Sequence, residues 1–112
     1  MQMTIDDHIE SDRAVLTVHG EVDVYTAPTL RERILTVISE GASTVVVDLS
    51  KVGFMDSTGL GVLVGALKRL RQSDGNLIVV CDSEPVLKIF AVTGLTDVFG
   101  VVPSLDEAPG QS

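Results

Sequence analysis

The sequence is poor in cysteine and in basic residues. Cys81 is the single cysteine among 112 residues, so the chain cannot form an internal disulfide. Eight Lys and Arg residues stand against sixteen Asp and Glu residues, which gives a net charge of −8. Phosphate backbones and anionic lipids repel such a protein. The charge therefore argues against nucleic acid or an anionic membrane as the main partner.

Long apolar runs and several short enzymatic motifs are also missing. No apolar stretch reaches membrane-spanning length, and no charged segment followed by an apolar one opens the chain. With the lone cysteine, this leads us to expect a cytoplasmic protein. No Gly-Lys-Ser/Thr phosphate-binding loop occurs. The only histidines, His8 and His19, lack the spacing of metal ligands, so we predict no metal site and no cofactor.

What the sequence does contain is the pattern of one α/β domain. Apolar residues make up 45% of the chain, which is ordinary for a globular fold. We expect a single domain over residues 1–112, ordered over about 3–108 and followed by a mobile tail. Strands are predicted at 3–6, 14–19, 44–49, 76–81 and 96–102, helices starting near Thr26, Asp56 and Asp82, and a last helical turn at 104–108.

This order predicts a mixed sheet. The first two strands are joined by a short turn and should form an N-terminal hairpin. Later strands alternate with helices and should be parallel, with the helices packed mainly on one face. A loop is expected over residues 20–26, with Thr26 capping the next helix through its side chain.

The most informative stretch is 54–61, Phe-Met-Asp-Ser-Thr-Gly-Leu-Gly. An apolar strand precedes it and a helix with leucines at helical spacing follows it. Asp56, Ser57 or Thr58 can therefore cap the helix by accepting hydrogen bonds from its first N–H groups. A hydroxyl is presented at the carboxyl end of a strand, where open α/β sheets usually meet ligands and partners.

Several functions of this stretch can be weighed from the residues. A hydrolase with Ser57 as nucleophile lacks the Gly-x-Ser-x-Gly motif, because Met55 stands two residues before the serine. A phospho-receiver domain would use Asp48 at a strand end, but no lysine follows Lys88 to complete the site. Ser57 could merely cap the helix. It could also be a phosphorylation switch, with Glu21 and Asp23 as acidic neighbours if their loop lies beside it.

Three motifs resemble a known family. The stretch 54–63 resembles the signature of the anti-sigma-factor antagonists, small proteins made of one STAS domain. Gly-Glu-Val-Asp at 20–23, before a helix start with Thr26, is similar to their second signature. Residues 87–90 with Thr-Gly-Leu at 93–95 resemble the third. The resemblance runs from about residue 5 to 102, and the details are similar to the actinobacterial branch.

The resemblance implies a STAS-like fold and a bacterial regulator of transcription that is not an enzyme. Such an antagonist binds an anti-sigma factor with serine kinase activity and so frees a sigma factor. The kinase phosphorylates the serine and a PP2C-type phosphatase restores it. Ser57 maps onto the phosphorylated serine, while the partner-binding residues map onto Glu21, Asp23, Asp56, Ser57, Thr58, Gly59 and Leu60, with Gly61 beside them. The alternative is a non-switching STAS scaffold or adaptor in a signalling complex.

Overall fold

The protein's structure, a computed structural model, describes residues 3–107 and contains a five-stranded mixed sheet. The strands stand in sequence order, with β1 and β2 antiparallel and all later neighbours parallel. They are β1 (Met3–Glu10), β2 (Arg13–Val22), β3 (Thr44–Met55), β4 (Asn76–Val80) and β5 (Gly100–Val102). The predicted mixed sheet with an N-terminal hairpin is confirmed. The tail expected at 109–112 lies outside the described residues.

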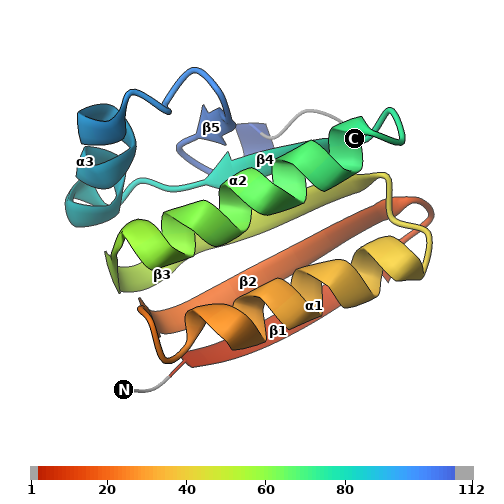
Figure 1. The fold of residues 1–112 in the computed structure, drawn as a ribbon, viewed down its shortest axis with the longest axis horizontal. Coiled ribbons are helices and arrows are strands. Elements are labelled where there is room, and N and C mark those ends of the chain that lie inside the picture. Colours follow the sequence, from red (N-terminus) through yellow and green to blue (C-terminus); the bar gives the residue numbers. More distant parts are fainter. Residues whose placement is uncertain (1–2, 108–112) are drawn as a thin grey trace.

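Three helices and a short 3-10 helix complete the fold: α1 (Ala27–Ser39), α2 (Ser57–Arg71), α3 (Glu84–Thr93) and η1 (Leu105–Glu107). α1 and α2 lie side by side across one face of the sheet, and α3 lies near the C-terminal end of β3 (Figure 1). No helix within residues 3–107 is long and apolar enough to cross a membrane.

The main core lies between the helices and the sheet. Along β2 the buried residues alternate, Ala14, Leu16 and Val18, as expected for a strand that turns one side toward a core. β3 is buried continuously over residues 45–47 because the sheet is covered on both sides there. Val46 belongs to a second, small cluster on the opposite face, where η1 contributes Leu105. The expected placement of the helices mainly on one face is confirmed.

Three strands are longer than their apolar runs predicted, and the first of them, β1, continues to Glu10. β2 continues to Val22, and β3 continues to Met55, where the sequence indicated a loop from residue 20 and a strand end at 49. The reason is mutual pairing, since Glu21 pairs with Phe54 and Val22 with Met55. Backbone hydrogen bonds between neighbours extend both strands beyond the residues that hydrophobicity marks. β5 is shorter than predicted, and covers only its last three residues.

The extension of β3 removes the phospho-receiver interpretation. Asp48 lies inside β3 and not at its end, so the prediction of a strand-end carboxylate was wrong. Its Oδ1 accepts hydrogen bonds from the Ser50 backbone N–H at 3.0 Å and the Ser50 hydroxyl at 2.6 Å. The carboxylate thus serves local structure on the strand.

Candidate functional site

Two loops meet where β2 and β3 end. Val22 and Met55 are paired, and the Asp56 backbone N–H donates to the Val22 carbonyl at 3.2 Å. The acidic loop after β2 and the serine after β3 therefore lie side by side. The sequence analysis expected Glu21 and Asp23 to be acidic neighbours of Ser57 only if these two loops were adjacent, and the structure meets that condition.

Asp56 is the residue that caps α2. Its backbone is extended, and its Oδ1 accepts hydrogen bonds from the N–H groups of Thr58 at 2.9 Å and Gly59 at 3.3 Å. The sequence left Asp56, Ser57 and Thr58 open as capping residues, and the structure selects the first. Ser57 is then the first residue of α2, with an exposed side chain that the cap does not use.

The small residue after Thr58 is required by packing. A Cβ atom on Gly59 would lie 2.6 Å from Cγ1 of Val22 and 2.9 Å from Cγ of Met55. α2 can approach the ends of β2 and β3 this closely only without a side chain here. Leu60 is also buried, at 4% exposure. Both residues hold the helix in place, and their contact with a partner stays a prediction. Gly61 is exposed.

Asp23 also points inward. It is only 8% exposed, and its Oδ1 accepts hydrogen bonds from the backbone N–H groups of Tyr25 at 2.9 Å and Thr26 at 3.1 Å. Burial alone would raise the pKa of the Asp23 carboxyl, but these hydrogen bonds, with one from the Thr26 hydroxyl, hold it below its usual value. Asp23 organises the loop, and its contact with a partner stays a prediction.

Thr26 has a different role from the one its sequence context predicted. It stands directly before α1, but its side chain accepts no hydrogen bond from that helix. Its hydroxyl instead donates to the Glu21 carbonyl at 2.8 Å and accepts from the Asp23 backbone N–H at 2.9 Å. These bonds close the loop on itself and leave the Glu21 side chain half-buried beside the site.

Exposed apolar side chains lie on the two segments that meet near the serine, and the sequence interpretation missed them. Tyr25 is 81% exposed, Val24 58% and Phe54 46%. Val24 and Tyr25 follow Asp23 in the loop, and Phe54 pairs with Glu21 at the end of β3. The sequence could have indicated this surface, because large apolar residues stand inside an otherwise polar loop. Together with Ser57 and Thr58 they form a mixed polar and apolar surface, which we call the switch edge.

Comparison with known proteins agrees with this architecture. Residues 1–108 match the family described as STAS domain. The anti-sigma-B factor antagonist of Staphylococcus epidermidis is 43% identical over 101 residues, which cover 90% of this chain and 94% of the relative. An anti-sigma factor antagonist from Mycobacterium paratuberculosis has a crystal structure with a TM-score of 0.86, 31% identity, and coverage of 95% and 90% of the two chains.

The antagonist SpoIIAA has been solved in two states. Its unphosphorylated form has a TM-score of 0.80 and 26% identity, with 93% of this chain and 91% of that chain covered. The phosphorylated form of the Bacillus protein has a TM-score of 0.72 and 25% identity, with coverage of 93% and 95%. The chain belongs to the STAS-domain family, in its group of anti-sigma-factor antagonists.

Proposed function

We propose that the protein is an anti-sigma-factor antagonist that binds an anti-sigma factor through the switch edge and is released when Ser57 is phosphorylated. Binding would free a sigma factor for transcription. The observation that carries this proposal is the placement of Ser57. It is exposed at the first residue of α2, beside the loop that follows β2. The names of its relatives and the two states of SpoIIAA support the proposal.

Phosphorylation would act through charge. A phosphate adds about −1.5 to −2 charges at neutral pH. At the switch edge it would stand next to Asp56 and near Glu21, in a protein whose net charge is already −8. Enclosing such a group in an interface without a cationic partner costs several kcal/mol. A loss of about 2.8 kcal/mol already weakens binding about a hundredfold.

The cap of α2 determines where the phosphate would lie. Because the Asp56 carboxylate already accepts from the N–H groups of Thr58 and Gly59, a phosphate on Ser57 could reach those donors only by displacing it. Repulsion between the two anions opposes that arrangement. We therefore expect the phosphate to project from the surface and to alter binding more than it alters the fold.

The partners follow from this switch. The anti-sigma factor would itself be the serine kinase, so that the unphosphorylated protein is its substrate, and a PP2C-type phosphatase would remove the phosphate. The protein would then carry no catalytic residue of its own. Tyr25, Val24 and Phe54 supply exposed apolar area for the complex, and aromatic residues are enriched at such interfaces.

The test compares variants of Ser57 in titrations with the anti-sigma factor of the source bacterium. Ser57→Ala should bind as tightly as the unphosphorylated protein and stay bound when ATP is added. Ser57→Asp should bind about a hundredfold more weakly. Ser73→Ala is the matched control, because it removes an exposed serine hydroxyl outside the switch edge. Equal affinities for the alanine and aspartate variants would contradict the switch and favour a constitutive scaffold.

Phosphopeptide mapping after incubation with ATP and the kinase provides a second readout. Phosphate on Ser57, and none on the Ser57→Ala variant, supports the assignment. Phosphate at Thr58 alone would contradict the assignment of Ser57 as the phosphorylated residue.

A further inference from the structure

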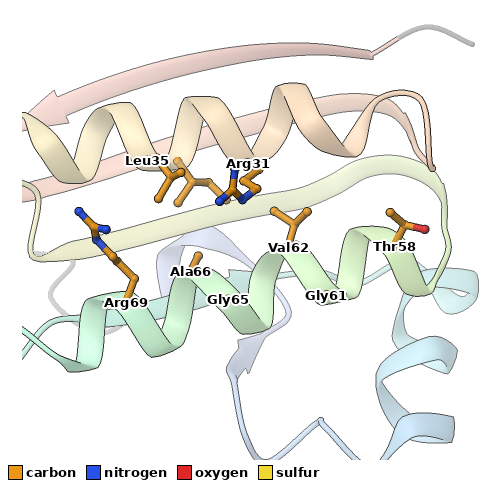
Figure 2. Close-up of a pocket in the computed structure, with 9 residues that line it drawn as sticks. Arg31, Leu35, Thr58, Gly61, Val62, Gly65, Ala66 and Arg69 are labelled. Carbon is orange, nitrogen blue, oxygen red and sulfur yellow. The ribbon is translucent and has the colours of Figure 1, made fainter.

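A concave feature lies between the two helices that cover the sheet. The hollow has a volume of about 440 Å³ and is bounded by α1 on one side and α2 on the other. Its apolar walls include Leu35 of α1 and Val62 and Ala66 of α2 (Figure 2). Small-molecule sites usually occupy roughly 300–1,000 Å³ and often lie between helices, so the hollow has the size and position of a ligand site.

Two glycines keep the hollow open. Gly61 and Gly65 are one helical turn apart on α2, and both line the space. A Cβ atom on either residue would meet nothing within 4 Å. The helix packing therefore does not require glycine at these positions, in contrast to Gly59. Their effect is to leave room beside Val62 and Ala66.

The charge of the hollow is opposite to that of the protein. Arg31 of α1 and Arg69 of α2 line it, and Figure 2 shows both guanidinium groups in the space between the helices. No acidic residue belongs to its lining. Within residues 3–107, the ion pair of Arg33 with Asp7 and the contact of His19 with Asp6 involve neither Arg31 nor Arg69. The arginines thus place two positive charges at an apolar surface in a protein with a net charge of −8.

We propose that the α1–α2 hollow binds a small amphipathic organic anion, with a carboxylate or phosphate group held between Arg31 and Arg69 and an apolar body against Leu35, Val62 and Ala66. Guanidinium groups bind carboxylates and phosphates through paired, charge-assisted hydrogen bonds. The apolar body would extend along the glycine side of α2 toward Thr58, whose side chain also lines the hollow. This proposal does not rest on the proposed function of Ser57.

The test is a titration of the full chain followed by amide chemical shifts. The probes are decanoate and octyl phosphate, which carry the two possible head groups. Inorganic phosphate tests the head group alone, and 1-octanol tests the apolar body alone. Saturable shifts with decanoate or octyl phosphate, centred on Arg31, Leu35 and residues 61–69, support the proposal. The probe that binds more tightly shows whether the site prefers a carboxylate or a phosphate head group.

Variants separate this site from general attraction to a surface. Arg31→Gln and Arg69→Gln should each weaken binding about tenfold or more, because each removes a charge-assisted hydrogen bond. Arg71→Gln is the matched control, because Arg71 is an exposed arginine of α2 outside the lining. Gly65→Leu should fill the hollow and abolish binding. A folded amide spectrum of Gly65→Leu confirms that the loss comes from occlusion.

Several results would overturn the proposal. These are the absence of saturable shifts up to the solubility of both amphipathic probes, equal affinity in the Arg31 and Arg71 variants, or equally tight binding of inorganic phosphate or octanol. If the amphipathic probes fail while Arg31→Gln weakens the complex with the anti-sigma factor, the hollow belongs to a protein interface. The small-ligand proposal is then wrong and the proposed function stands.

Discussion

A Cβ atom placed on Gly59 would lie 2.6 Å from Cγ1 of Val22, so the helix that begins at Ser57 rests directly on the last residue of β2. This contact joins the two motifs that the sequence shows more than thirty residues apart. The same close approach fixes Ser57 beside the loop organised by Asp23. Packing beneath the switch edge therefore determines which groups are neighbours at its surface.

The first prediction concerns this contact. Gly59→Ala should lower the free energy of unfolding by about 1–3 kcal/mol, because its methyl group overpacks against Val22 and Met55. Gly61→Ala is the control on the same helix. It meets no neighbour and should stabilise the protein by up to about 1 kcal/mol through helix propensity. Urea denaturation measures both. Equal stability of the two variants would show that α2 can move away from β2 without cost.

The second prediction tests the cap. Asp56→Ala should lower the free energy of unfolding by about 0.5–2 kcal/mol, because the N–H groups of Thr58 and Gly59 lose their acceptor. Ser57→Ala should change it little, since the serine does not cap the helix. Hydrogen exchange should increase at the first turn of α2 in the Asp56 variant only. Faster exchange in the Ser57 variant instead would assign the cap to the serine.

The third prediction is a pH dependence. The pKa of Asp23 is lower in the folded protein than in the unfolded chain, so its stabilisation is present at neutral pH. It should be lost as the pH falls from about 4 through the folded-state pKa. Thermal melts of Asp23→Asn should show a lower Tm at pH 7 and a smaller further loss on acidification than the parent. Asp23→Lys should also lower the Tm, because a lysine cannot accept the hydrogen bonds from the Tyr25 and Thr26 backbone N–H groups.

A fourth prediction concerns the exposed aromatic residues. Tyr25→Ser and Phe54→Ser should leave the Tm nearly unchanged and weaken binding of the anti-sigma factor, because both side chains are exposed at the switch edge. Val92→Ser is the control, since Val92 is 75% exposed on α3. Isothermal titration measures the affinities. An unchanged affinity in both aromatic variants would remove them from the interface.

The fifth prediction is that Cys81 is chemically inert in the native state. The side chain is buried, and burial, together with the nearby Asp82 and Asp48 carboxylates, raises the pKa of its thiol. The folded protein should therefore react slowly with a thiol reagent at pH 7, and addition of denaturant should restore fast reaction. Fast labelling without denaturant would indicate local opening of the segment after β4.

The sequence predicted the element order well, because that order follows from apolar periodicity and from capping residues. The meeting of the two loops was only a condition in the sequence interpretation, and the pairing of Val22 with Met55 fulfils it. The predicted lengths of β2 and β3 were too short. The pairing of Glu21 with Phe54 extends both strands, and it depends on a neighbouring strand that no local sequence pattern reveals. The resemblance gave no sign that Asp23 and Leu60 are buried, because motifs do not report burial. Tyr25 escaped notice for the same reason, as its exposure is a property of the folded loop.

The two edges of the sheet have a consequence for self-association. β1 carries exposed Asp6, Asp7 and Glu10 along one edge, and β5 at the other edge has three residues followed by Pro103. Edge strands that are charged, short or interrupted by proline are poor templates for another strand. Copies of the protein should therefore not extend each other's sheets, even at high concentration. Other molecules would then be bound by side chains on the loops and helices. A single added charge can dissociate a complex of that kind.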